Sequence, residues 1–422
     1  MTIMSRKMTI LLLVLLIATV VVGSHTTLVE DQIETKSETL LAQTYTDHDP
    51  VIIDGNDDLL DQAVIETWPG DGTENDPVNI SGYRITDINS ECIKISNVDL
   101  YWIVTGCMLE GGAIDGTGIL ISNVTNGEIS NNIIRDRDIA ISGVNGVFNC
   151  RITGNQMYDN AQNAIKVLNG MADMVISGNV IGPNGGNQFW ITGGFNDSII
   201  SGNIIEGGQN GIRVNACLRS SITGNIITAT ILEAIMLPLA TEATVTGNIV
   251  ESPWTNGISL SGLNHVIDSN IVNNCSGYGI YLASGDFASI CGNIVSNCAD
   301  YGLRLSASTA NSTVEENVFI DNNNEECQVI DDGDDNEFCY NHFNDWVSPD
   351  VDSDNIVDIP YSLDGETQNS DPYPLVDPDG PKPTPTTGPE VPSGLLVNPI
   401  IIIAAGAVIV LIAIAYALKK RG

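Results

Sequence analysis

The sequence predicts an all-β protein, a right-handed parallel β-helix (solenoid) of about twelve coils, followed by one C-terminal transmembrane α-helix. Three observations predict it: a motif that recurs every 22 to 25 residues, an abundance of Gly, Asn, Ile and Val, and an uncharged apolar run near the C-terminus. The period is too short for most helical repeats, which need about 33 residues or more. Aromatic residues are only 5% of the chain.

The N-terminal segment, residues 1–23, has the pattern of a secretory signal peptide. Arg6 and Lys7 precede an apolar run that small residues close. An uncleaved anchor is the alternative, but the run is short for a membrane span. Residues 24–49 are polar and aperiodic, and we expect a flexible leader there.

The repeat domain, residues 50–376, carries a motif of an apolar residue, a small polar residue, Gly, Asn and two apolar residues. Its Asn, or a substitute, falls at positions 83, 107, 132, 155, 179, 203, 225, 248, 270, 293, 317 and 341. A second motif lies midway between these positions: Gly-Ile, a variable residue and an apolar residue, as in Gly211-Ile212-Arg213-Val214. Short alternating runs separated by Gly and Asn are typical of strands and tight turns, so each repeat predicts one coil.

Equivalent residues of successive coils are expected to stack about 4.8 Å apart. Asn tolerates left-handed backbone conformations, and stacked Asn side chains can hydrogen-bond along a ladder. The Ile and Val columns would fill the interior.

The C-terminal segments predict a membrane anchor. Residues 377–394 are rich in Pro and Thr, which indicates a stiff extended stalk. Residues 395–418 contain no charged side chain and are long enough, at about 1.5 Å per residue, to cross about 30 Å of hydrocarbon. The basic tail, residues 419–422, favours a cytoplasmic C-terminus and an extracellular β-helix. We therefore expect a single-pass protein of the cell membrane; the alternative is a buried core helix.

The repeats resemble the parallel β-helix repeats of the pectin-lyase-like superfamily. The resemblance is strongest to the branch named for the NosD copper-processing protein, which also carries the label of a carbohydrate-binding and sugar-hydrolase domain. It covers about residues 50–376, flanks included. Residues 51–58 and 69–77 look like the opening segment of archaeal surface members, and residues 352–361 and 371–375 look like their closing segment. The resemblance implies a β-helix and an archaeal source, but the fold hosts lyases, hydrolases, epimerases, adhesins and non-catalytic proteins.

The charge balance excludes one class of partner. Acidic residues outnumber basic ones by 53 to 16, and the formal net charge is -37. A basic face for nucleic acid is therefore not expected. A strongly acidic surface suits an exterior or salty setting.

The nine cysteines leave two interpretations open. No Cys-x-x-Cys motif occurs, and an odd count leaves at least one thiol unpaired. Buried free thiols are favoured, and a few disulfides are the alternative in an oxidising exterior.

A column of outward residues in the second motif is the candidate ligand-binding surface. We expect it to contain Lys94, Leu120, Ala140, Lys166, Trp190, Arg213, Met236, Ser259, Tyr281 and Arg304. Residues 77–376 hold nine Lys and Arg, and four of them fall in this column. Cationic donors beside aromatic faces suit an acidic or sulfated polysaccharide, so Lys94, Lys166, Trp190, Arg213, Tyr281 and Arg304 are candidate ligand-binding residues. The alternative is a solvated face whose bases offset nearby acids.

Alternate aspartates give a candidate metal site. Asp350, Asp352, Asp354 and Asp358 could direct oxygens towards one point, as in calcium loops, and brace the last coil. The series departs from the EF-hand loop, because Asn355 replaces the usual Gly and the last ligand comes early. An acidic solvated loop is the alternative.

The signals for catalysis and for copper are weak. Asp136 and Asp159 occupy equivalent positions on adjacent coils, near the separation of a retaining glycosidase pair, but Asp in such turns usually caps the backbone. The four His residues form no cluster with Met or Cys, so no copper site is predicted.

The sequence therefore favours a membrane-anchored surface protein that binds a polysaccharide or a glycoprotein. A polysaccharide lyase or hydrolase acting at the cell surface is one alternative, and a structural envelope or adhesion protein without a ligand is the other.

Overall fold

The computed structural model describes residues 44–86, 90–111 and 116–380. The predicted signal peptide, most of the leader, the stalk from residue 381, the transmembrane helix and the basic tail lie outside these ranges. Within them, no helix is long and apolar enough to cross a membrane.

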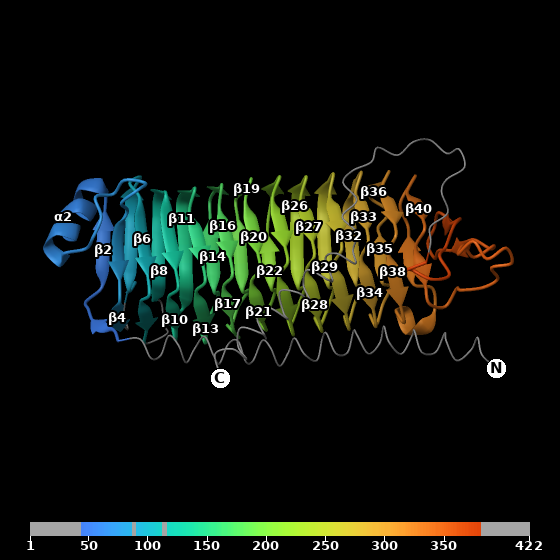
Figure 1. Ribbon diagram of the computed structural model, residues 1–422, viewed down its shortest axis with the longest axis horizontal. Coiled ribbons are helices and arrows are strands. Elements are labelled where there is room, and N and C mark those ends of the chain that lie inside the picture. Colours follow the sequence, from blue (N-terminus) through green and yellow to red (C-terminus); the bar gives the residue numbers. More distant parts are fainter. Residues whose placement is uncertain (1–43, 87–89, 112–115, 381–422) are drawn as a thin grey trace, which may run out of the picture.

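The chain winds into a rod built from three sheets, each made of parallel strands, with a helix at one end and loops at the other (Figure 1). Two of the sheets run through twelve successive strands, so the right-handed solenoid completes about 11 turns. The all-β solenoid is confirmed, and the expected count of twelve coils was high by about one turn, because twelve strands are joined by eleven crossovers.

Sheet A has 13 strands: β1 (Thr46–Asp47), β4 (Tyr83–Thr86), β7 (Met108–Glu110), β10 (Ile133–Arg135), β13 (Gln156–Tyr158), β17 (Val180–Ile181), β21 (Ile204–Glu206), β25 (Ile226–Thr228), β28 (Ile249–Glu251), β31 (Ile271–Asn273), β34 (Ile294–Ser296), β38 (Val318–Ile320) and β41 (His342–Phe343). Sheet B follows β2 (Val51–Asp54), β5 (Ile93–Val98), β8 (Thr117–Thr125), β11 (Ile139–Phe148), β14 (Ile165–Leu168), β18 (Phe189–Thr192), β22 (Ile212–Val214), β26 (Ile235–Thr241), β29 (Ile258–Leu263), β32 (Ile280–Asp286), β35 (Leu303–Leu305) and β39 (Val329–Asp331). Short strands extend it: β15 (Met171–Ala172), β19 (Phe195–Asn196), β23 (Cys217–Leu218) and β36 (Thr309–Ala310). Sheet C has 12 strands: β3 (Val78–Ser81), β6 (Trp102–Thr105), β9 (Gly127–Ser130), β12 (Arg151–Thr153), β16 (Val175–Ser177), β20 (Ile199–Ser201), β24 (Ser221–Thr223), β27 (Thr244–Thr246), β30 (Val266–Asp268), β33 (Ser289–Cys291), β37 (Thr313–Glu315) and β40 (Glu337–Cys339).

The interior is filled by stacked aliphatic side chains, as the repeats predict. In sheet C, Ile152, Ile176, Ile200 and Ile222 are register neighbours and are each at most 1% exposed. Burial of each such side chain contributes about 1.5–3 kcal/mol.

The predicted asparagine ladder is present. From Asn132 to Asn317, each side-chain amide donates to the Oδ1 atom of the next ladder Asn at 2.9–3.1 Å, and the ladder reaches Asn341. One expectation needs correction, because the residue before the Asn takes the left-handed conformation. Gly154, for example, has φ +67° and Asn131 has φ 54°. The ladder Asn residues themselves do not have a positive φ and are buried, with their side-chain amides in the ladder.

Both ends of the solenoid are covered (Figure 1). Helix α2 (Asn56–Glu66) buries Leu59 and Ala63 against the first coil. At the other end, a 3-10 turn η1 (Asn323–Glu325) precedes the closing segment, whose strands β42 (Tyr361–Ser362) and β43 (Ser370–Asp371) pair antiparallel. No disulfide joins cysteines of the described residues, and six of the nine cysteines are buried.

Candidate functional site

The register of sheet B places the six candidate ligand-binding residues in one column on its outer surface. Lys166 on β14 lies beside Trp190 on β18, which lies beside Arg213 on β22. Further along, Tyr281 on β32 lies beside Arg304 on β35. One assignment was wrong: Ser142, not Ala140, lies between Leu120 and Lys166. Ala140 is completely buried.

The central part of this column is a cation–aromatic–cation triplet. The Nζ atom of Lys166 lies 5.0 Å from the ring centre of Trp190, within cation–π range. On the next coil, Arg213 uses Nε to donate to Asn215 Oδ1 at 3.3 Å. All three side chains are partly exposed. We call Lys166, Trp190 and Arg213 the central triplet.

Lys94, Lys166 and Arg213 form no ion pair with any residue that the structure describes. By contrast, Arg84, Arg135, Arg219 and Arg304 each lie within 4.0 Å of a carboxylate. Cations without acidic partners are unexpected in a chain with 53 acidic residues. Their donors remain available to an anion.

Arg304 differs from these cations because neighbouring side chains already engage its two terminal nitrogens, while its buried Nε has no hydrogen-bond partner among the described residues. Its guanidinium carbon lies 5.1 Å from the ring centre of Tyr278 and 5.6 Å from that of Tyr281. Arg304 Nη1 also donates to the Tyr278 hydroxyl, and Arg304 Nη2 lies 3.6 Å from Asp332 Oδ2. The sequence pattern did not predict a role for Tyr278. Its position three residues before Tyr281, at the corner that leads into β32, is the feature that could have indicated this contact. This end of the column is a closed cluster.

Near the N-terminal end, Lys94 lines a hollow of about 680 Å³ on sheet B. Strands β2, β5, β8 and β11 form its walls, and Asn and Ser side chains from the ends of these strands line it together with Lys94.

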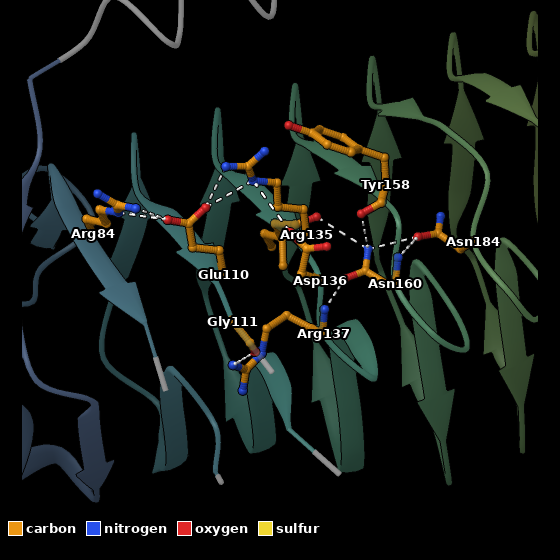
Figure 2. Close-up of polar contacts among 10 residues, drawn as sticks. Arg84, Glu110, Gly111, Arg135, Asp136, Arg137, Tyr158, Asn160 and Asn184 are labelled. Carbon is orange, nitrogen blue, oxygen red and sulfur yellow. Dashed lines mark hydrogen bonds and ion pairs between the residues drawn. The ribbon is translucent and has the colours of Figure 1, made fainter. Parts of the chain in front are cut away.

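A second charged cluster, on sheet A, was not predicted (Figure 2). Glu110 accepts hydrogen bonds from Arg84 Nε at 2.7 Å and from Arg135 at 2.7 and 3.0 Å. Burial alone would raise the pKa of Glu110, but the hydrogen bonds from Arg135 and Arg84 lower it below its ordinary value. The carboxylate therefore stays ionised and pairs with both arginines. The three residues come from three coils and link them, and we call this cluster the Glu110 clamp.

Asp136 and Asp159, the weak catalytic candidates, lie on adjacent coils, as expected. Both are exposed and adopt left-handed conformations, with φ 54° and 56°. The same corner of later coils uses Gly207, Ala229 and Ser252 in that conformation. Asp136 also lies 3.8 Å from the Arg135 guanidinium (Figure 2). This geometry matches the turn-forming role of Asp.

The aspartate series of the closing segment is brought together in part. Asp350, Asp352 and Asp354 each offer an oxygen within 4.8 Å of the others. Asp358 is used differently, because its Oδ2 accepts the backbone N–H of Val351 at 2.7 Å. Three carboxylates are hard ligands that suit Ca²⁺.

Comparison with known proteins identifies the family. The profile described as "Periplasmic copper-binding protein (NosD)" matches residues 103–265 and 186–373, which together exceed half of the chain. The chain belongs to the NosD family. No curated protein matches it.

Several solved β-helix structures are similar to this member of the NosD family. Azotobacter vinelandii mannuronan C-5 epimerase AlgE6 A-module is 14% identical, with 66% of this chain and 91% of that chain covered and a TM-score of 0.43. DFA-IIIase from Arthrobacter chlorophenolicus is 14% identical, with coverage of 56% and 67% and a TM-score of 0.41. An alginate lyase from Paenibacillus sp. is 13% identical, with coverage of 68% and 95% and a TM-score of 0.37. We take no residue role from any of them.

The described residues of this NosD-family chain bring no group of three His or Cys ligands together for copper. Soft-metal sites gather His, Met or Cys ligands. In the described ranges, the one group of three His, Cys, Asp or Glu ligands is the set of three aspartates at residues 350–354. Carboxylate oxygens favour hard cations, so this set does not support copper chemistry.

Proposed function

We propose that this protein is a membrane-anchored cell-surface protein whose β-helix binds an acidic polysaccharide or glycoconjugate along sheet B. The observation that carries the proposal is the column itself. Lys94, Lys166 and Arg213 share one face and have no ion-pair partner among the described residues.

The central triplet supplies two kinds of contact that such a ligand needs. Lys166 and Arg213 can donate charge-assisted hydrogen bonds to carboxylates or sulfates, each worth about 1.5–3 kcal/mol. Trp190 lies between them and is partly exposed; the Lys166 ammonium lies over its ring, and the exposed part of the ring can contact the C–H face of a sugar. The column runs across successive coils, which favours an extended chain over a compact ligand.

The proposed location rests on the sequence. The signal peptide, stalk, apolar segment and basic tail support an extracellular β-helix, a single span and a cytoplasmic C-terminus. The flanking segments that look like those of archaeal surface proteins, together with the net charge of -37, support an archaeal source and a salty exterior.

We also propose that Asp350, Asp352 and Asp354 bind Ca²⁺ and brace the closing segment. Their oxygens lie within 4.8 Å of one another, and the series Asp-x-Asp-x-Asp is typical of calcium loops. Asp358 is left out of the ligand set because it is not part of this group; its Oδ2 accepts the Val351 N–H.

A glycan-array screen of the purified full-length protein, with and without Ca²⁺, tests the proposal. The Trp190→Ala, Arg213→Ala double variant serves as comparison. We expect wild-type binding to acidic glycans and its loss in the variant. Absence of wild-type binding to any glycan would instead support a structural envelope role. Turnover of a bound polymer would support the ectoenzyme alternative.

A further inference from the structure

The hollow around Lys94 has its own chemistry, separate from the central triplet. Lys94 lies between Ile52 on one coil and Leu120 on the next in the register of sheet B, so its side chain is flanked by two aliphatic residues. Ile52 is 45% exposed. A single cation between apolar side chains can hold one anionic group while the apolar walls contact the sugar ring that carries it.

A row of amides lines the same hollow. Asn97, Asn123 and Asn145 all adopt left-handed conformations, with φ between 50° and 58°, which puts their side chains on one edge. Asn123 Nδ2 donates to Asn97 Oδ1 at 2.8 Å, and Asn145 Nδ2 donates to Ser122 Oγ at 3.1 Å. Within the described residues, each of these amides has further donor or acceptor capacity for hydroxyl groups.

One carboxylate, Asp54, also lines the hollow. Asn97 Nδ2 donates to Asp54 Oδ1 at 2.6 Å, and Asp54 forms no ion pair with Lys94. Lys94 therefore keeps its donors for a ligand.

Lys94 in the hollow and the central triplet belong to the same column of register neighbours on sheet B. Register neighbours lead from Lys94 through Leu120 and Ser142 to Lys166, which is three coils, and Arg213 lies two coils further. At about 4.8 Å per coil, Lys94 is about 14 Å from Lys166 and about 24 Å from Arg213 along the axis. A ligand that touches all three cations must be a polymer.

We propose that the Lys94 hollow is a distal subsite that takes one anionic sugar unit of the same chain that the central triplet holds. The proposal rests on the proposed function and adds to it a minimum ligand length and a direction, parallel to the solenoid axis. Two linked contacts raise the affinity more than either one, because the second forms at high effective concentration.

Heparin-derived oligosaccharides of defined length test this, since they carry both carboxylates and sulfates. Calorimetric affinities of the full-length protein would be compared for a disaccharide and for a chain that spans more than about 24 Å. We expect the long chain to bind at least about tenfold tighter. Lys94→Gln should lose most of this length-dependent increment, whereas Lys166→Gln should weaken the binding of both oligosaccharides.

The control variants distinguish failure of the distal subsite from failure of the proposed function. Arg151→Gln removes an exposed cation of sheet C and should leave both affinities unchanged. Equal affinity of the wild type for both lengths, or long-chain binding by Lys94→Gln that equals the wild type, would overturn the distal subsite alone. No binding of any oligomer would overturn the proposed function and the subsite with it. Circular dichroism of each variant establishes that it is folded.

Discussion

Asn341 and Asp371 join the last coil to the closing segment. The Asn341 side-chain amide donates to Asp371 Oδ2 at 2.8 Å, and the Asn341 backbone N–H donates to the same oxygen at 3.0 Å. Both residues are completely buried, and burial raises the pKa of Asp371. The ladder of amides thus ends on an acid supplied by a segment 30 residues further along the chain.

Asp371→Ala is expected to lower the free energy of unfolding by about 1–3 kcal/mol, because two buried N–H groups of Asn341 lose their acceptor. Denaturant unfolding followed by circular dichroism measures this. Glu366→Ala, an exposed substitution in the same segment, should change the stability by less than about 0.5 kcal/mol. Equal stability of the two variants would show that the ladder does not need its terminal acid.

His265 should make the protein less stable in mild acid. It is 1% exposed, and burial lowers the pKa of its imidazole below the ordinary 6.5. Below pH 6.5 the unfolded chain therefore binds the proton more tightly than the folded protein, and stability falls as the pH falls. His342 has a pKa lowered in the same way, so His265→Met should remove only part of the effect. The measurement is the unfolding free energy at pH 7.5 and pH 5.5. An identical pH dependence in the variant and the wild type would contradict the assignment.

Calcium should stabilise the closing segment if Asp350, Asp352 and Asp354 bind it. Ligand at about 100 times its dissociation constant raises the unfolding free energy by about 2.7 kcal/mol. Thermal unfolding with Ca²⁺ and with a chelator measures the shift. Asp352→Asn with Asp354→Asn should abolish the shift, and Asp334→Asn with Asp335→Asn is the matched acidic control. The calcium site is supported if the Ca²⁺-dependent shift is lost in the Asp352, Asp354 double variant and kept in the Asp334, Asp335 double variant. A shift that both double variants keep would contradict the site.

Salt should act on polyanion binding in an unusual direction. A net charge of -37 repels a polyanion over about 30 Å at 0.01 M salt, but over only about 8 Å at 0.15 M. The close contacts of Lys166 and Arg213 are screened less than this long-range repulsion. Affinity should therefore rise from about 0.01 M to about 0.15 M salt and decline towards 1 M. A steady fall from the lowest salt, as for a cationic protein, would contradict this balance of forces.

The sequence predicted the features that depend on periodicity, which include the solenoid, the asparagine ladder and the sheet B column. The error at Ala140 has a clear cause. Ile139 and Ile141 both fit the apolar position of the motif, and a slip of two residues preserves the alternation, so alternation alone cannot detect it. The Glu110 clamp and the Tyr278 contact to Arg304 depend on distances between coils, which no local pattern encodes.

The central claim is that the unpaired cations of sheet B bind a polyanion. The most direct test is the affinity of the full-length protein for dextran sulfate at about 0.15 M salt, with neutral dextran as the ligand control. Arg213→Gln and Arg151→Gln each remove one positive charge that has no ion-pair partner in the described structure, on sheet B and sheet C respectively. The account predicts binding of dextran sulfate but not dextran, a loss of about tenfold (about 1.4 kcal/mol) for Arg213→Gln, and no change for Arg151→Gln. Equal affinities of the two variants, or no binding by the wild type, would contradict it.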